Sequence, residues 1–486
     1  MAAIDNHASQ KPRHTGDLDA MLWGIEKDPL LRQTITVVLT LDRAPDREVL
    51  LDRLERGSRT LPSFRHRLVE APLRLSTPRW IVDQNFDLSY HVRWIGAPSD
   101  GSLDGVLEFA RQSTMSGLDR ERPLWTITVV EGLTGGQAAL ILTVNHVMSD
   151  GTGLLAIFGL LGDLTRKPRD LGPMPTMPEP EDQSRLGLAT EAASYTTRRI
   201  LGLLGRSAGS TVRALPTVVR RPRDTATTVA KDVWAVTRIV APNLKTLSPL
   251  MTERRGWLRF AALEADLDRL RKAAKTRGCT VNDAFLTAVA HGFALYHQRH
   301  GKPVERLRTT IPVDIRKPGD PLFGNRVNGC RMAIPVGVDD PGAAMATYHE
   351  LIDGLKGVAK LPLAAALGTL INAFGPVVNL VIGLIMKHDD FVLSDVNAGE
   401  LPFYLAGAKV LSIFPFGPPI GTAANITLVG YRHKALIGIN VDAAAVPDLG
   451  ALVACIREGF DAVIALGDEG QHLICGESSP DNLPDG

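Results

Sequence analysis

Apolar residues in the first part of the chain follow two different spacings. A helix is predicted to follow Asp17, because aspartate commonly caps the start of a helix. Its apolar positions, three to four residues apart, are Leu18, Met21, Leu22 and Ile25. Residues 34–41 (TITVVLTL) are rich in β-branched side chains and predict a strand. A second helical pattern follows at residues 49–54, so helix and strand alternate here.

Two later strands place a histidine at a strand end. Residues 124–131 (LWTITVVE) and 138–144 (AALILTV) predict an antiparallel hairpin around a pair of glycines. The second strand leads directly to His146, and a new helix is predicted at residues 154–164. His146 is therefore expected at the end of a buried strand, where side chains can reach a cleft.

The second half of the chain repeats the alternation. An amphipathic helix is predicted to end at Gly278. Its apolar positions are Leu263, Leu267, Leu270 and Ala274. Thr280 and Asp283 have the spacing of a capping box, which predicts a helix at residues 281–296. Strands are predicted at residues 309–313, 426–431 and 435–441. Both halves therefore indicate α/β lobes.

A proline-rich segment separates the halves. Residues 166–182 contain five prolines, which disfavour both helix and central strand. We divide the chain into a disordered tail, a first lobe, a linker with a basic segment, a second lobe and a second tail. These are residues 1–16, 17–165, 166–224, 225–470 and 471–486.

Two segments raise the question of membrane contact. Residues 192–223 contain seven arginines and no acidic residue, and Arg199, Arg206, Arg213 and Arg220 recur every seven positions. This pattern is typical of an interfacial helix, and a solvated linker is the alternative. Residues 361–386 carry no charge, but Pro376 interrupts them. Two helices joined near Pro376 fit better than one transmembrane span.

Composition narrows the class of protein. The 486 residues carry 54 basic and 53 acidic side chains, so net charge gives no general attraction to nucleic acid. The four cysteines have no metal-site or disulfide spacing, which indicates unpaired thiols in a reducing compartment. The first 17 residues lack the apolar segment of a signal peptide, so they are expected to be a tail.

His146, followed by Asp150 and Gly151, has a chemical rationale. An alcohol attacks a thioester poorly until a base of near-neutral pKa removes its proton, and histidine suits that task. Asp150 is expected to hold the loop or orient the imidazole, and Gly151 leaves room for close approach. Asn145 adds an amide beside the base. The alternative is a hydrogen-bonded polar residue at a strand end.

A series of motifs, in order over nearly the whole chain, resembles the bacterial wax ester synthase/diacylglycerol acyltransferase family. The motifs are Leu18–Met21, Pro62–Arg65, Trp80, Phe86–His91, Arg122–Trp125, Asn145–Gly151, Thr280–Asp283, Ile311–Val313 with Arg316, Gly324–Asn325, Pro415–Pro418, Ala424–Thr427 and Val446–Asp448. The resemblance implies two lobes like chloramphenicol acetyltransferase, with the active-site channel between them.

The same resemblance implies an activity and its setting. The family transfers an acyl chain from acyl-CoA to diacylglycerol or a long-chain alcohol, giving triacylglycerol or wax ester. His146 would be the base, with Asp150 as its motif partner. Acyl-CoA would be a co-substrate, and neither a cofactor nor a metal is expected. The protein would be cytoplasmic, bound peripherally to the inner face of the membrane or to lipid droplets.

Three more residues are candidates for the channel. Asp283 is expected to cap its helix, whereas Asn282 beside it can face the channel. Arg316 is expected to pair with Asp150, because related acyltransferases use an Arg–Asp pair. Ser394 begins the segment SDVNAG, where the family has SNxPGP. Without both prolines, we expect either a looser turn there or one that recognises a different acceptor.

A second departure lies in the catalytic motif. The family has HHxxxDG, and Asn145 replaces its first histidine. An asparagine exchanges hydrogen bonds but does not titrate, so it is expected to support His146 or contact substrate. Two alternatives stay open: condensation-type acyl transfer from a carrier protein, and a non-catalytic lipid-binding homologue.

Overall fold

The computed structural model describes residues 14–70, 76–98, 100–179, 184, 186–198, 245–316, 325, 327–359, 383 and 385–474. The predictions for the arginine series at 199–220 and for nearly all of the uncharged segment 361–386 fall outside these residues. So do residues 1–13 of the predicted first tail and residues 475–486 of the second.

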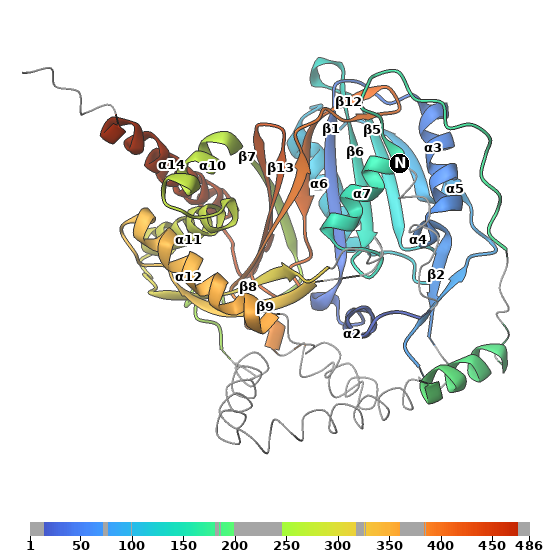
Figure 1. The fold of residues 1–486 in the computed structure, drawn as a ribbon, viewed down its shortest axis with the longest axis horizontal. Coiled ribbons are helices and arrows are strands. Elements are labelled where there is room, and N and C mark those ends of the chain that lie inside the picture. The colour runs from blue at the N-terminus through green and yellow to red at the C-terminus, as the bar shows by residue number, and fades with distance from the viewer. Residues whose placement is uncertain are drawn as a thin grey trace, which may run out of the picture.

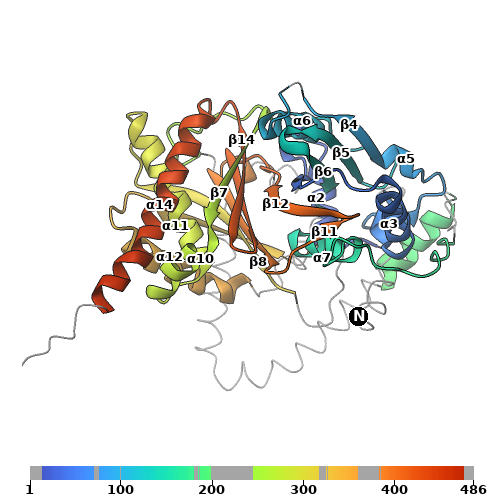
Figure 2. The same cartoon turned by 90° about the horizontal axis from the view of Figure 1, so that it is seen from above.

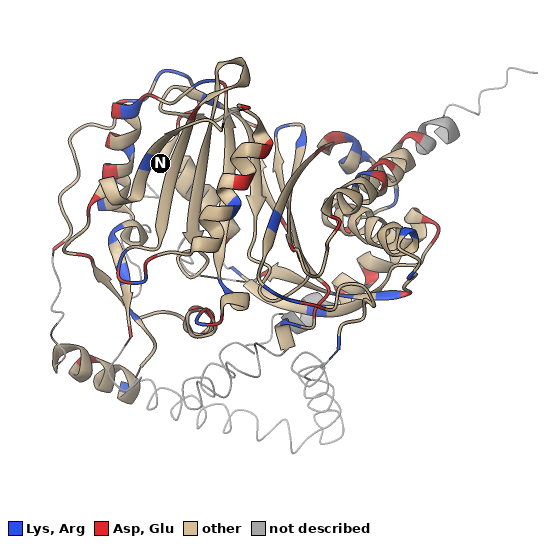
Figure 3. Ribbon diagram, turned by 180° about the vertical axis from the view of Figure 1, so that it is seen from behind, with Lys and Arg blue, Asp and Glu red and all other residues tan. Residues whose placement is uncertain are grey.

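The first lobe is built on a six-stranded sheet with strand order β11-β12-β1-β6-β5-β4. Its strands are β1 (Thr34–Leu41), β4 (Val92–Gly96), β5 (Trp125–Leu133), β6 (Gln137–Asn145), β11 (Tyr404–Leu405) and β12 (Ala408–Phe416). The predicted hairpin is confirmed as the antiparallel pair β5 and β6. Strands β1 and β6 carry no charged residue, because both lie in the middle of the sheet. In the ribbon of Figure 3, the charged residues lie mainly on helices and loops.

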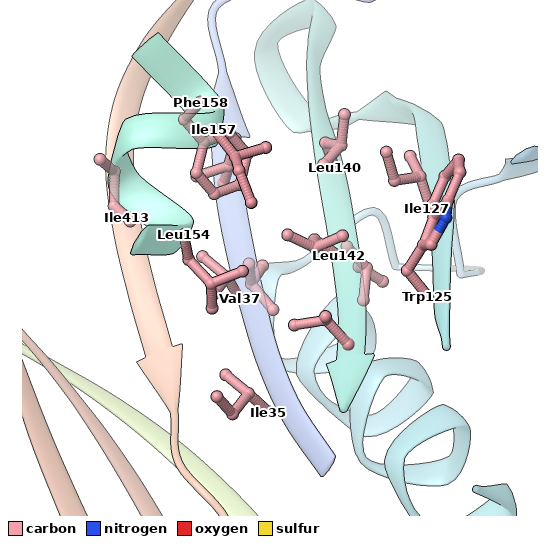
Figure 4. Packing of buried hydrophobic residues seen from close by; sticks show 14 of the residues in the cluster. Ile35, Val37, Trp125, Ile127, Leu140, Leu142, Leu154, Ile157, Phe158 and Ile413 are labelled. Carbon is pink, nitrogen blue, oxygen red and sulfur yellow. The ribbon is translucent and has the colours of Figure 1, made fainter. Parts of the chain in front are cut away.

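Helices and a small second ribbon complete this lobe. The helical segments are α2 (Asp17–Ile25), η1 (Pro29–Leu31), α3 (Arg47–Thr60), α4 (Pro62–Arg65), α5 (Leu88–His91), α6 (Leu103–Ser116), η3 (Thr134–Gly136) and α7 (Gly151–Leu161), with a further helix at 186–198. Strands β2 (His66–Val69) and β3 (Arg79–Val82) pair antiparallel. Figure 4 shows Leu154 and Phe158 of α7 beside Val37 of β1, so α7 closes one face of the sheet.

The second lobe has its own six-stranded sheet, in the order β7-β14-β13-β10-β8-β9. Its strands are β7 (Leu258–Asp266), β8 (Arg306–Asp314), β9 (Val327–Pro335), β10 (Phe391–Gly399), β13 (Ala424–Tyr431) and β14 (Lys434–Asp442). Its helices are α10 (Leu267–Thr276), α11 (Val281–Arg299), α12 (Pro341–Ala359) and α14 (Leu449–Ile474). They cover the side of this sheet away from the first lobe (Figures 1 and 2).

The second half of the chain also contributes to the first sheet. Strands β11 and β12 lie in the sequence interval assigned to the second lobe, yet β12 pairs with β1 from Thr36 to Leu41. The two lobes are thus joined by strands β11 and β12, which the second half of the chain adds to the first sheet, as well as by the linker. A division at one point in the sequence does not anticipate this crossing, because strand pairing depends on residues far apart in the chain.

Several predicted boundaries were wrong. Gly16, rather than Asp17, is the N-cap of α2. Leu263 lies in β7, since β7 pairs along its whole length with β14, and the helix begins only at Leu267 behind its cap Asp266. The helix predicted at 154–164 begins earlier, at Gly151, and ends at Leu161. Helix α14 extends to Ile474, into the predicted tail.

Two further predictions have a structural outcome. Cys279, Cys330 and Cys455 are free thiols, as expected, and Cys475 lies outside the described residues. Within the described part of the chain, no helix combines the length and apolar composition that a bilayer crossing requires.

Candidate active site

A cavity of about 430 Å³ lies between the two sheets, and His146 is one of its lining residues. The first lobe contributes mostly apolar walls from α2, β1, α7 and β12: Leu18, Met21, Leu22, Ile35, Val37, Leu154, Leu155, Phe158 and Ile413. The second lobe contributes residues of β8, β9, β10 and β13, including Val392, Ser394, Val396 and Val429. The expected channel between two lobes is therefore present, and its apolar lining suits a hydrocarbon chain.

The end of β6 positions His146. Its backbone N–H donates to the carbonyl of Gln33 over 2.7 Å, which ties it to the segment before β1. The Met148 N–H closes a turn on the carbonyl of Asn145 over 3.0 Å. As the sequence predicted, the imidazole lies directly after the end of a buried strand, in the turn that follows β6.

Asp150 performs two structural tasks. Its Oδ1 accepts from the Gly153 N–H over 3.0 Å, so it is the N-cap of α7. Its Oδ2 accepts from Nη2 of Arg316 over 2.6 Å. The expected pairing of Arg316 with Asp150 is thus confirmed, while their part in turnover stays a prediction. The carboxylate is largely buried, with 4% of its side chain exposed against 16% for Arg316.

Gly151 is required by close packing. A Cβ atom at this position would lie 2.9 Å from Cγ2 of Val396, a cavity-lining residue of β10. The glycine therefore lets the first turn of α7 approach the second lobe closely. This agrees with the role that the sequence assigned to it.

Asn145 supports the loop and does not line the cavity. Its Nδ2 donates to Oε1 of Glu26 over 2.6 Å, and its Oδ1 accepts from the Val147 N–H over 3.0 Å. Burial raises the pKa of Glu26, and the hydrogen bond from Asn145 opposes that shift. Of the two roles open for Asn145, the structure favours support of its neighbours over contact with substrate.

Asn325 was not predicted as a site residue, although it belongs to one of the ordered motifs. Its Nδ2 donates to Oδ1 of Asp19 over 2.6 Å and to the backbone oxygen of His146 over 2.8 Å. Asp19 lies on α2 and is 6% exposed. These contacts join positions far apart in the chain, so no local pattern indicates them.

The environment of His146 favours the neutral imidazole. Burial lowers the pKa of His146, while its own backbone, the charge of Asp150 and the side chain of Asn325 oppose that shift. The Nδ1 atom is buried and has no hydrogen-bond partner among the described residues. A neutral imidazole beside an apolar cavity is suited to accept a proton at physiological pH.

The other two channel candidates differ in their placement. Ser394 lines the cavity, whereas Asn282 is not among the lining residues. Asp283 forms the predicted capping box with Thr280 and also accepts from His349 over 2.7 Å. The looser turn expected from Ser394 onward was wrong: these residues continue β10 and pair with β13, with a register shift between Asn397 and Gly399. Without prolines, each residue there keeps an N–H for the ladder.

One group among the described residues has donors close enough for a metal ion: Cys279, Asp283 and His349, within 4.8 Å of one another. None of the three lines the cavity. Oδ2 of Asp283 already accepts hydrogen bonds from Thr280 and His349. Asp283, the carboxylate of this group, therefore already has a structural role as part of a helix cap.

Solved structures define the class of this fold. The wax ester synthase/diacylglycerol acyltransferase of Marinobacter aquaeolei VT8 superimposes with a TM-score of 0.63 and 20% identity, covering 94% of this chain and all of that one (100%). The first condensation domain of the calcium-dependent antibiotic synthetase gives a TM-score of 0.62 at 16% identity, covering 94% of this chain and 97% of that one. The fold is thus the two-lobed, chloramphenicol-acetyltransferase-like fold.

Sequence comparison then gives the family. The model of the wax ester synthase/diacylglycerol acyltransferase catalytic domain matches residues 16–285, and that of the WS/DGAT C-terminal domain matches residues 323–463. A putative diacylglycerol O-acyltransferase of Mycobacterium tuberculosis is 30% identical over 458 residues, covering 93% of this chain and 91% of that protein. The chain belongs to the wax ester synthase/diacylglycerol acyltransferase family and is an acyltransferase of lipid biosynthesis.

Proposed function

We propose that this acyltransferase moves a long acyl chain from acyl-CoA to the hydroxyl of diacylglycerol or of a long-chain alcohol, with His146 as the general base. One observation carries the proposal: the buried imidazole of His146, whose pKa burial lowers, lines a largely apolar cavity between the lobes. Acyl-CoA is a co-substrate in this scheme, and no cofactor or metal takes part.

The proposed reaction needs one proton acceptor that later becomes a donor. The hydroxyl oxygen attacks the thioester carbonyl carbon while an unprotonated imidazole nitrogen of His146 takes the hydroxyl proton. The tetrahedral intermediate then collapses, the carbon–sulfur bond breaks, and the imidazolium returns the proton to the CoA thiolate. The products are an ester and free CoA, and His146 is again neutral.

The walls of the cavity support a hydrophobic acyl group. Side chains such as Leu18, Leu154 and Phe158 line the cavity, and each buried methylene contributes about 0.8 kcal/mol. Ser394 is the polar residue of β10 in this lining, and we propose that it contacts the substrate near the motif.

The test uses purified protein with radiolabelled palmitoyl-CoA and either diacylglycerol or hexadecanol. Ester formation by the wild type, lost by more than a hundredfold in His146→Gln with unchanged folding, supports the proposal. Ester formation that survives the substitution would contradict the role of His146. The variant Gln137→Ala, at the opposite end of β6, is the matched control for folding and activity.

The same experiment separates the two alternatives. The condensation-domain likeness in fold motivates a carrier-protein donor, so palmitoyl-phosphopantetheine on a carrier protein is assayed beside palmitoyl-CoA. Transfer from the carrier alone would favour condensation-type chemistry. Retained acyl-chain binding without ester from any donor would favour a non-catalytic lipid-binding protein.

We further propose a peripheral location at the inner face of the membrane or on lipid droplets. Five large apolar side chains at the end of the first lobe and in the linker sequence are exposed: Leu164 (62%), Leu171 (37%), Met174 (38%), Met177 (55%) and Leu186 (79%). They precede the basic segment, so both can meet an anionic lipid surface. Flotation with anionic liposomes tests this, and binding unchanged after Arg199, Arg206, Arg213 and Arg220 become Gln would contradict it.

A further inference from the structure

Asn325 contacts the backbone of His146, and each of the two residues has one buried polar side-chain atom that no hydrogen bond within the described part of the chain explains. The Asn325 Nδ2 group donates to the backbone oxygen of His146 over 2.8 Å. Nδ1 of His146 and Oδ1 of Asn325 are both buried, and neither has a hydrogen-bond partner among the described residues. A buried donor without an acceptor costs about 1–3 kcal/mol, so two complementary unpaired atoms on neighbouring groups demand an explanation.

The orientation of the Asn325 amide follows from its other contacts. Both hydrogen-bond partners of Nδ2, the Asp19 carboxylate and the His146 carbonyl, offer acceptors. A flipped amide would point its oxygen at these two oxygens, so Nδ2 is fixed where it stands. The amide oxygen is then the group left for the imidazole.

The effect of Asn325 on the ring has the matching sign. The Asn325 side chain raises the pKa of His146, against the lowering caused by burial. An imidazolium has only donors, so an amide favours it through its oxygen. The backbone of His146 itself also raises the pKa of His146. The carbonyl of this backbone is the group to which Asn325 donates.

We infer that Asn325 is a positioning residue for His146: its amide oxygen accepts the Nδ1 hydrogen, which leaves Nε2 as the basic nitrogen, and Asp19 of α2 holds the amide in that orientation. This inference rests on the proposed role of His146 as the base. The uncharged amide fixes the tautomer without the strong rise in basicity that a carboxylate would bring.

The arrangement also connects the base to a wall of the cavity. Helix α2 lines the cavity through Leu18, Met21 and Leu22, and its Asp19 anchors Asn325. Just after the end of the same helix, Glu26 binds Asn145. A displacement of α2 would therefore break the contacts that hold Asn145 and Asn325 beside the His146 backbone. The imidazole would then no longer be held in one tautomer.

The first measurement is the tautomer itself. Histidine side chains are labelled with ¹⁵N, and the His146 signals among the 12 histidines are assigned by their loss in His146→Gln. We expect Nδ1–H in the wild type and a mixture of tautomers in Asn325→Ala. An Nε2–H tautomer in the wild type, or an unchanged tautomer in Asn325→Ala, would overturn the inference. This readout does not depend on activity, so it stands even if no ester is formed.

Activity gives the second measurement. Asn325→Ala is expected to lower kcat at least tenfold with less than a threefold change in KM for the acyl donor. The control is Asn397→Ala, at the exposed end of β10, with kcat within twofold of the wild type. Equal kcat in the two variants would overturn the inference.

A side-chain exchange separates positioning from folding. In the double variant Asp19→Asn, Asn325→Asp, the amide and the carboxylate trade places, so one hydrogen bond between residues 19 and 325 is kept, while the bond from residue 325 to the His146 carbonyl is lost. The carboxylate now faces Nδ1 and favours the imidazolium, so the acid limb of kcat/KM moves to higher pH than in the wild type. An acid limb at the same pH would mean that residue 325 does not face the ring.

Discussion

Arg316 donates through Nη2 to Oδ2 of Asp150 over 2.6 Å, across 166 positions of sequence. The pair joins the loop after β8 to the first turn of α7, next to the proposed base. Because both side chains are mostly buried, removing either one leaves an uncompensated charge at a cost of about 3–5 kcal/mol. We predict that Arg316→Ala and Asp150→Ala are non-additive, with a coupling of at least about 1 kcal/mol in urea unfolding.

The double-mutant cycle needs a variant that keeps the helix cap. Asp150→Asn still accepts from Gly153 and caps α7, since Asn and Asp are both good N-caps. Asp150→Asn removes the charge alone, so the stability lost in this variant measures the ion pair without the cap. Simple additivity of Arg316→Ala with Asp150→Ala would contradict the coupling.

We predict that only the lack of space prevents a larger side chain at position 151. A Cβ atom would meet Cγ2 of Val396 at 2.9 Å, and the stiff, β-branched valine has little freedom to move. Gly151→Ala should therefore destabilise the protein by about 1–3 kcal/mol, although alanine is the better helix former. The measurement is the urea midpoint, and Val396→Ala in the same chain should recover most of the loss. If Gly151→Ala is neutral or stabilising, Val396 moves aside at little cost and the prediction is wrong.

The parts of the site that the sequence predicted are local ones. Two apolar strand segments around a glycine pair define the hairpin that presents His146, and Thr280 with Asp283 encodes a cap within four residues. Asn325 and Asp19 meet across 306 positions, which no local pattern contains. Leu263 was assigned to the wrong element for the same reason, because pairing with β14 outweighed a helical spacing. Only the motif resemblance anticipated a distant contact, that of Arg316 with Asp150.

Asn145→Asp is predicted to make stability depend on pH. It places a second carboxylate against Glu26, whose pKa burial already raises. Two adjacent carboxylates hold a proton more tightly in the folded state than in the unfolded one. Stability is therefore present near pH 4 and is lost as pH rises. Urea unfolding at pH 5 and pH 8 should show a loss larger by about 1–3 kcal/mol at the higher pH. Asn145→Ala, which adds no charge, is the control, and equal losses at both pH values would contradict the pairing.

His91 is predicted to limit stability in acid. Its imidazole is fully buried (0% exposed), donates through Nδ1 to the carbonyl of Trp125 over 2.6 Å, and makes stacked contacts with both Phe86 and Trp125. Burial lowers its pKa, so between the folded and unfolded values the unfolded chain binds one more proton. The stability it contributes is present above pH of about 6.5 and is lost as pH falls, by about 1.4 kcal/mol per unit. Urea unfolding from pH 7.5 to 5.0 should therefore have a shallower pH slope in His91→Gln than in the wild type. His433→Gln, with its side chain 74% exposed in the wild type, leaves the buried imidazoles in place and is the control. An unchanged slope in His91→Gln would mean that His91 takes up no proton on unfolding.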